Sequence, residues 1–262
     1  MSKEKYEQGK KMYLKGCSIN KISKELNISR SRFSIWLKNE GVIVNRTPSK
    51  SSIIQNIFET IDTEEKAYWL GFMYADGYVS KDRNDIELSL CLNDIQHLEK
   101  FKDFIGWSGE VKIDTNRCRV AFRDTKIKEG LIDKGCVPQK SLILTFPSES
   151  QVPDNLIPHF MRGYFDGDGC ICNTDKTFEV SVIGTDTFLE KMIDKLNLRK
   201  KKIYVLGKNK NNYRYCLQSK NDAEQYLDIL YKDCNIYLDR KYEKYKNFKY
   251  CRLNSTAVEE LR

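Results

Sequence analysis

The stretch Phe160-Met-Arg-Gly-Tyr-Phe-Asp-Gly-Asp-Gly-Cys170 has a counterpart earlier in the chain, Tyr68-Trp-Leu-Gly-Phe-Met-Tyr-Ala-Asp-Gly-Tyr78. A constant offset of 92 residues superposes the two stretches, so that Asp76 aligns with Asp168 and the glycines that follow them align as well. Both stretches are largely apolar and end in Asp-Gly. This pattern predicts two helices, each closed by a glycine in the left-handed conformation.

Small residues recur four positions apart in both stretches, Gly71 with Ala75 and Gly163 with Gly167. On a helix this spacing makes one thin stripe, along which two backbones approach closely. If the two helices pack by these stripes, the aspartates at their ends come to lie side by side.

Paired aspartates at helix ends are electrostatically unfavourable. Each carboxylate faces the negative end of a helix dipole, and the two repel each other. A divalent cation relieves both effects, because hard cations prefer carboxylate oxygens. A single Asp-Gly is also a common turn dipeptide, but two copies with the same internal stripe favour a metal site.

At these residues the chain resembles the LAGLIDADG homing endonucleases, in the form that carries two motifs on one chain. Trp69-Leu-Gly-Phe-Met-Tyr-Ala-Asp-Gly77 and Met161-Arg-Gly-Tyr-Phe-Asp-Gly-Asp-Gly169 fit the nine-residue pattern, with an acid at the eighth position of both. The likeness spans residues 64–250 and leaves the amino-terminal fifth unexplained. One departure is Tyr74, where the second copy has Asp166; in the family that position is not the metal ligand.

The resemblance implies an α+β fold of two pseudo-symmetric αββαββα repeats that form a saddle-shaped DNA-binding surface. It implies a metal-dependent endonuclease that makes a double-strand break with short 3′ overhangs at a long, nonpalindromic site. Asp76 and Asp168 would be the catalytic metal ligands, one for each strand, and the residues before them, Ala75 and Gly167, are assigned to the metal site. Mg²⁺ is the expected ion, because it is oxygen-ligated and binds substrate phosphates.

Two lysines are carried over from the family by their place in each half. Gly135-Cys-Val-Pro-Gln-Lys-Ser141 closes the first half and Tyr237-Leu-Asp-Arg-Lys-Tyr242 holds the corresponding place in the second. In the family a lysine from this region reaches each side of the active site. Lys140 and Lys241 are therefore predicted to be catalytic, with an ordinary exposed lysine as the alternative for each.

Net charge is +8, and the excess is concentrated near the amino terminus. Residues 1–50 hold 12 of the 45 Lys and Arg but only 4 of the 37 Asp and Glu, so the remaining residues are neutral in sum. This imbalance indicates a polyanionic partner for the amino-terminal segment. Residues 199–214 add seven basic residues and no acid, a run that alone is typical of a solvated face.

Nine cysteines lack a Cys-x-x-Cys pair, and the chain has only two histidines, so a zinc site is poorly supported. The thiols are typical of small core residues in a reducing compartment. The amino terminus lacks the apolar region of a signal peptide, and no apolar run approaches membrane-spanning length. We expect a soluble, cytoplasmic monomer with no membrane partner.

Residues 4–40 are predicted to form three short helices within an amino-terminal domain of residues 1–44. The stretch from Ile22 to Leu37 resembles the helix-turn-helix of resolvases and transposase-like proteins, with Asn27 in place of the usual turn glycine. The resemblance places residues 29–39 in the major groove of DNA. The contact residues would then be Ser29, Arg30, Ser31 and Arg32, with Lys21 and Lys24 nearer phosphates. The alternative is a plain three-helix bundle whose charges only keep it soluble.

The remaining boundaries follow composition and repeat length. Residues 45–62 are predicted to be a linker, although the apolar stretch 53–58 would either lie along DNA or pack on the core. The two repeats occupy 63–150 and 151–252, and residues 253–262 form a frayed tail or short helix. Period-two alternation predicts strands at 85–92, 110–114, 117–122, 178–183, 202–206 and 213–217; helical patterns cover 94–105, 124–133, 186–196 and 221–231.

One face of each sheet must cover the core, which leaves the other face free to bind DNA. Lys, Arg and Asn are the residue types that read base edges and contact phosphates. The candidates are Lys81, Arg83, Asn84, Lys112, Asn116, Arg117, Arg119 and Arg123 in the first half, and Asn173, Lys176, Lys202, Tyr204, Lys208, Asn209, Lys210, Asn211, Asn212 and Arg214 in the second.

Two other functions compete with the endonuclease. Relatives of this fold also bind nucleic acid without cutting it, as intron RNA-splicing maturases or transcription regulators, so intron RNA is an alternative partner. Loss of a motif acid would indicate that class, and here both acids are present. A regulator built on the helix-turn-helix alone, with an effector-sensing remainder, leaves the doubled Asp-Gly helices without a role.

Overall fold

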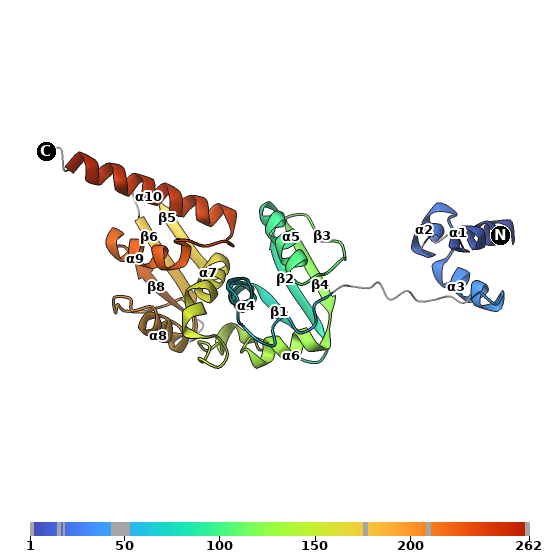
Figure 1. Cartoon of the computed structure of the whole chain (residues 1–262), viewed down its shortest axis with the longest axis horizontal. Helices are drawn as coiled ribbons and strands as arrows, with labels where there is room; N and C mark the ends of the chain where they lie inside the picture. Colours follow the sequence, from blue (N-terminus) through green and yellow to red (C-terminus); the bar gives the residue numbers. More distant parts are fainter. Residues whose placement is uncertain are drawn as a thin grey trace. The chain divides into compact units, whose positions relative to one another are not determined.

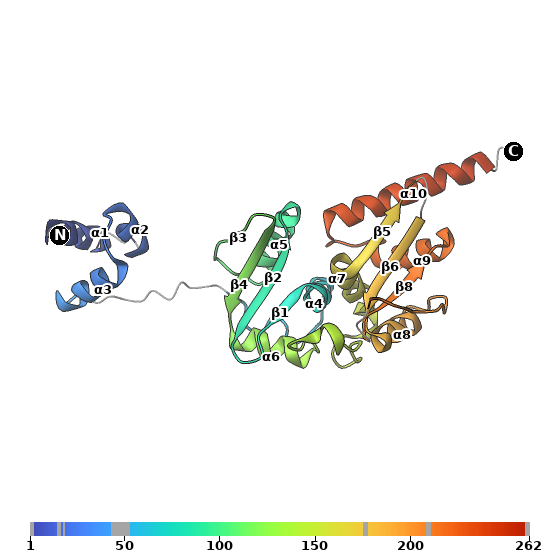
Figure 2. The ribbon, with the colours of Figure 1, turned by 180° about the vertical axis from the view of Figure 1, so that it is seen from behind.

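Figures 1 and 2 show a computed structural model of the chain, which describes residues 3–14, 17, 19–42, 53–174, 178–207 and 211–259. The chain divides into two compact units, residues 1–50 and residues 51–262, called unit 1 and unit 2 below. None of the helices in the described ranges is long and apolar enough to cross a lipid bilayer.

The described residues of unit 1 form three helices: α1 (Lys3–Leu14), α2 (Ile19–Glu25) and α3 (Arg30–Asn39). Ile22 and Leu26 from the middle stretch pack with Phe33 and Leu37 of α3, as their spacing predicted. Asn27 adopts a positive φ of 50° in the turn between α2 and α3, so it takes the place of a turn glycine. Ser29 lies at the start of α3, but its side chain makes no capping bond; its hydroxyl lies 3.1 Å from that of Ser31.

Unit 2 contains two halves with the same order of helices and strands. The first half consists of α4 (Glu64–Ala75), β1 (Gly77–Val79), β2 (Asp85–Cys91), α5 (Ile95–Phe104), β3 (Lys112–Ile113), β4 (Arg117–Arg123) and α6 (Thr125–Asp133). The second half consists of α7 (Ile157–Asp168), β5 (Gly169–Asn173), β6 (Phe178–Gly184), α8 (Asp186–Lys195), β7 (Tyr204–Val205), β8 (Tyr213–Leu217) and α9 (Lys220–Tyr231). Short 3-10 turns occupy Leu92–Asp94, Lys140–Leu142 and Asp154–Leu156.

Each half builds one four-stranded antiparallel sheet, in the order β1-β2-β4-β3 and β5-β6-β8-β7. Burial alternates along β2 and β4, with Ile86, Leu88 and Val120 fully buried on the core side. Period-two alternation thus confirms one covered and one free face for this sheet. In both views α4 and α7 lie side by side between the two sheets (Figures 1 and 2).

The small-residue stripes bring α4 and α7 into backbone contact. A Cβ atom added to Gly71 would lie 1.9 Å from the Phe160 carbonyl oxygen, and one added to Gly163 would lie 1.9 Å from the Tyr68 carbonyl oxygen. These two contacts are related by the 92-residue offset. Thr63 caps α4 by accepting a hydrogen bond from the Lys66 amide, which fixes where this helix begins.

The prediction that a left-handed glycine closes each motif helix is wrong. Gly77 and Gly169 are not among the described residues with positive φ; each is the first residue of a strand, and Gly169 has φ −92° and ψ 162°. Glycine is required at these two positions because a side chain would clash with the preceding helix. A Cβ atom on Gly77 would lie 2.5 Å from the Met73 carbonyl oxygen, and one on Gly169 would lie 2.1 Å from the Phe165 ring.

Two predicted boundaries also need correction. Residues 53–62 of the predicted linker belong to unit 2, because Ile57, Phe58 and Ile61 are buried in its core; residues 43–52 lie outside the described ranges. The predicted tail of 253–262 overlaps α10 (Asp239–Glu259), a 21-residue helix that the sequence analysis missed. Its stretch is mostly charged and polar, so Tyr245 and Phe248, which it buries, leave only a weak periodic pattern.

Candidate active site

The two motif aspartates emerge at the same end of the paired helices. Asp168 is the last residue of α7, and Asp76 directly follows α4. A Cβ atom added to Gly167 would lie 2.3 Å from the Ala75 Cβ and 3.1 Å from the Asp76 Oδ2. The carboxylate of Asp76 therefore lies against the residue that precedes Asp168, which is the juxtaposition that the stripes predicted.

Both carboxyl groups have raised pKa values. Loss of hydration, and then the negative charge of Asp76, raise the pKa of Asp168 to about 6, while Lys140 and Lys241 oppose the shift. Loss of hydration also raises the pKa of Asp76, against the positive charges of Lys241, Lys140 and Arg240. The two carboxylates and the two lysines therefore act on one another within a single electrostatic environment.

Each lysine donates a hydrogen bond to the glycine that follows a motif acid. Lys140, at the start of a 3-10 turn, donates to the Gly77 carbonyl, and Lys241, in the first turn of α10, donates to the Gly169 carbonyl at 2.6 Å. Gly77 and Gly169 are counterparts at the 92-residue offset, whereas the two lysines are not. Two segments of unrelated sequence thus bring a lysine ammonium group to equivalent places beside the two acids.

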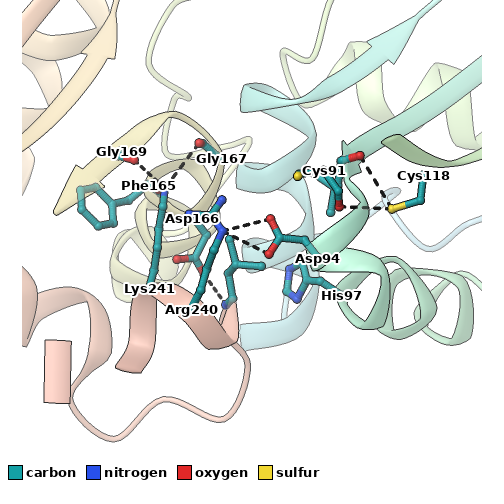
Figure 3. Close-up of polar contacts among 12 residues, drawn as sticks. Cys91, Asp94, His97, Cys118, Phe165, Asp166, Gly167, Gly169, Arg240 and Lys241 are labelled. Carbon is teal, nitrogen blue, oxygen red and sulfur yellow. Dashed lines mark hydrogen bonds and ion pairs between the residues drawn. The ribbon is translucent and has the colours of Figure 1, made fainter. Parts of the chain in front are cut away.

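Lys241 is the more enclosed of the two lysines, with 3% of its surface exposed. It also donates to the Phe165 carbonyl at 2.5 Å and lies 3.4 Å from the Gly167 carbonyl. Loss of hydration lowers its pKa to about 8, and the charge of Asp166 opposes this shift. Figure 3 shows its side chain reaching the end of α7.

An ion pair that the sequence did not predict connects α10 to the first half. Arg240 Nε lies 3.1 and 3.0 Å from the two carboxylate oxygens of Asp94, as Figure 3 shows. The Asp94 side chain is buried, and its charge raises the pKa of Asp76 while that of Arg240 lowers it. The partners lie 146 positions apart in the chain, so no local pattern could have found them.

The residues present fit a divalent cation. Asp76 and Asp168 offer hard oxygen donors in a partly dehydrated place, where their mutual repulsion favours a positive ion. Ala75 and Gly167, the residues that precede the two acids, face each other across the helix contact. Within the described residues no cluster of three or more His, Cys, Asp and Glu forms a competing metal site. A cavity of about 400 Å³, lined in part by Ala75, Lys140 and Asp168, opens beside Asp168.

The sequence matches no protein-family model and no curated protein, but solved structures share its fold. A double lysine-to-alanine mutant of I-SmaMI is 12% identical, with a TM-score of 0.55, over 74% of this chain and 92% of its own. The LAGLIDADG homing endonuclease I-GzeII, in complex with its DNA target, is 13% identical with a TM-score of 0.52, over 78% and 94%. The homing endonuclease I-LtrWI, bound to target DNA, is 13% identical with a TM-score of 0.51, over 76% and 94%.

Unit 2 has the LAGLIDADG fold. In this fold the first sheet brings Lys112, Arg117, Arg119 and Arg123 to its free face, since the residues alternate with buried ones on β4 and Lys112 pairs with Arg119. Acidic side chains pair with these basic residues: Arg119 lies 3.6 Å from Glu87, and both Arg123 and Arg83 pair with Asp85. Lys81, Asn84 and Asn116 are exposed in the loops that flank the strands.

The second sheet of the LAGLIDADG fold has a comparable free face. Arg214 pairs with Glu179 and lies opposite Tyr204, whose ring is 5.8 Å from the Lys202 ammonium. Asn173 is exposed at the end of β5, and Asn211 and Asn212 precede β8. The remaining candidates, Lys176, Lys208, Asn209 and Lys210, lie outside the described residues.

In unit 1, all four predicted base-contacting residues are exposed around the first turn of α3: Ser29, Arg30, Ser31 and Arg32. Lys21 on α2 and Lys24 near its end are exposed as well. The side chains are therefore accessible, as a DNA-contacting helix requires.

Proposed function

We propose that the protein is a site-specific homing DNA endonuclease that cuts both strands of a long target. The observation that carries the proposal is the doubled arrangement at the ends of α4 and α7, where Asp76 and Asp168 each lie beside a lysine-bonded glycine carbonyl. The LAGLIDADG fold and the DNA-bound structures of similar fold support the same function.

The protein's own groups divide the work. Asp76 and Asp168, with the backbone at Ala75 and Gly167, would hold divalent cations, for which Mg²⁺ is the proposed ion. Such an ion supplies an activated water and stabilises charge on the leaving oxygen when it is bound. Lys140 and Lys241 would stabilise negative charge on the phosphate that is cut, and their hydrogen bonds to the Gly77 and Gly169 carbonyls hold both lysines in place.

The equivalence of the two halves supports one catalytic centre for each strand. Because the halves repeat the same order of elements, we propose a pseudo-twofold arrangement in which the free faces of both sheets bind one duplex as a saddle. Cleavage by both centres would leave short 3′ overhangs. A single chain carries both motifs, so a monomer suffices.

Unit 1 is proposed to be a helix-turn-helix domain that lengthens the contacted site. Its exposed Arg30 and Arg32 lie at the start of α3, and the net positive charge of the whole chain is concentrated in residues 1–50. A positive surface of this kind contributes salt-dependent affinity for phosphates.

The test is incubation of the purified protein with duplex DNA of the genomic locus that hosts its gene, lacking the inserted element. We expect cleavage of both strands in Mg²⁺, and binding without cleavage in Ca²⁺. A duplex recovered from a randomised library by binding in Ca²⁺ serves as the second substrate. Failure to cut either substrate in Mg²⁺ would refute the endonuclease, and tight binding without cutting would indicate a non-cleaving relative.

A further inference from the structure

The two motif helices carry different polar side chains at the buried position two residues before the metal-site acid. Tyr74 occupies it in α4 and Asp166 in α7, and the 92-residue offset makes them equivalent. Both side chains are almost wholly buried, with 1% and 0% of their surfaces exposed. Neither is a candidate metal ligand, so the site described above leaves their polar atoms unexplained.

Asp166 accepts three hydrogen bonds from three different elements. Tyr231 Oη at the end of α9 donates to Oδ1 at 2.5 Å, and Oδ2 accepts from Tyr68 Oη at 2.8 Å and from the Leu238 amide at 2.7 Å. Leu238 immediately precedes α10, and its carbonyl accepts from the Lys241 amide at 2.9 Å. Asp166 therefore fixes the turn from which the Lys241 side chain reaches back to Gly169.

Tyr74 makes the corresponding connection in the first half, but it donates a hydrogen bond where Asp166 accepts. Its hydroxyl donates to the Lys134 carbonyl at 2.5 Å, where the segment that carries Lys140 begins. The next residue, Gly135, has φ 92°, and a Cβ atom there would lie 2.0 Å from the Tyr74 hydroxyl. The Cys136 thiol adds a contact of 3.4 Å to the Met73 carbonyl. The segment is thus held to α4 at its start.

Resting on the proposed function, we propose that Asp166 and Tyr74 are positioning residues, each of which holds the lysine of its own half and so serves one DNA strand. A buried carboxylate is costly unless hydrogen bonds satisfy it. An apolar side chain would fill the same space in a helix whose only role is packing. At both equivalent positions the polar atom instead binds the backbone of the lysine-bearing segment, through an amide in one half and a carbonyl in the other.

The test is strand-resolved cleavage of the host-locus duplex, labelled with a different fluorophore on each strand. Lys140→Ala and Lys241→Ala first identify the strand that each lysine serves. We expect Tyr74→Phe to slow the strand that Lys140→Ala slows, and Asp166→Asn to slow the strand that Lys241→Ala slows. Each should slow its strand by about 5- to 10-fold, the loss expected for one hydrogen bond, and leave the other strand within about twofold.

Controls separate this inference from loss of folding and from the proposed function itself. If Asp166→Asn does not fold, Tyr231→Phe removes a single donor to Asp166 and should show the same strand bias. Equal slowing of both strands, or slowing of the strand that the other lysine serves, overturns the inference while the endonuclease stands. A wild-type protein that cuts neither strand overturns the proposed function, and this inference with it.

Discussion

The two halves of unit 2 are equivalent at the contact between α4 and α7, and they differ in the segments that carry the two lysines. Gly71 and Gly163 make the same backbone approach, and Lys140 and Lys241 bind equivalent carbonyls. The segments that bring the lysines differ: a loop closes the first half, and the long helix α10 closes the second. The two halves therefore share the helix contact, the acid ends and the order of the strands, and they differ in the segments that bring the lysines.

A second asymmetry concerns how the halves are joined. The buried Arg162 on α7 pairs with Glu64 at the start of α4 at 2.6 Å and also donates to the Ile236 and Leu230 carbonyls. The equivalent residue in α4 is Leu70. Arg162 therefore joins the second half both to α4 and to the segment that leads into α10. Leu70, its equivalent in the first half, has no polar side chain with which to do this. Variants at equivalent positions measure how far the halves remain interchangeable.

The largest effect is expected from the motif acids. Asp76→Asn and Asp168→Asn should each reduce double-strand cleavage by about 1,000-fold, because each removes a ligand from a cation worth several kcal/mol to the transition state. Affinity for the target in Ca²⁺ should remain within about tenfold. Single-turnover cleavage and filter binding measure the two quantities. Asp103→Asn on α5, an exposed acid, is the matched control, and a comparable loss there would contradict the assignment.

The equivalence of the helix contact is tested by stability. Gly71→Ala and Gly163→Ala each introduce a Cβ atom 1.9 Å from a backbone oxygen, so both should lower the free energy of unfolding by at least about 3 kcal/mol. The two losses should be similar. Gly130→Ala on α6, whose Cβ atom would lie 3.2 Å from Phe58, should change stability by less than about 1 kcal/mol. Urea denaturation measures all three free energies of unfolding. If Gly163→Ala left the stability unchanged, the two helix contacts would not be equivalent.

Unit 1 is expected to add affinity without adding chemistry. Deleting residues 1–47 should weaken target binding by about 10- to 100-fold and flatten its dependence on salt, because fewer phosphates are neutralised. Cleavage by the bound complex should continue. Fluorescence anisotropy across a salt series measures the slope, and unchanged affinity would refute the proposed role of this unit.

The smallest effect is the pH dependence of stability that Asp168 contributes. The pKa of Asp168 in the folded protein is raised from 3.8 to about 6, so the native state binds this proton more tightly than the unfolded chain does. The metal-free protein should therefore gain stability as the pH falls from 7 through 6. Ca²⁺ binds the ionised carboxylate. Added Ca²⁺ should therefore raise the Tm of the protein by about 2–4 °C well above pH 6, and this rise should be lost below pH 6. Calorimetry checks both trends, and Asp168→Asn should remove them.

Much of unit 2 could be predicted from the sequence because its decisive signals are local. The Gly71 and Gly163 stripes predicted the helix contact, and alternation predicted β2, β4, β6 and β8 to within two residues at each end. The conformation of Gly77 could not be predicted, since a Cβ clash with Met73 favours the same residue type as a positive φ does. The Asp94–Arg240 pair joins distant segments, and no local pattern encodes such a contact.

The site's supporting bonds were missed for the same reason. The sequence marks Asp166 only as the counterpart of Tyr74, the residue that departs from the pattern, because the donors to Asp166, Tyr68, Tyr231 and Leu238, come from three other segments. Lys140 and Lys241 are predicted from the family resemblance by their place in each half. Their hydrogen bonds to equivalent carbonyls appear only when the chain is folded.

The most direct measurement is anomalous diffraction from crystals of the protein bound to its target duplex in Mn²⁺. We predict anomalous peaks within coordination distance of Asp76 and Asp168, with a phosphate of each strand against them and the duplex on the free faces of the two sheets. Metal bound elsewhere, or a duplex bound away from those carboxylates, would contradict the assignment of Asp76 and Asp168 as the cleavage centre.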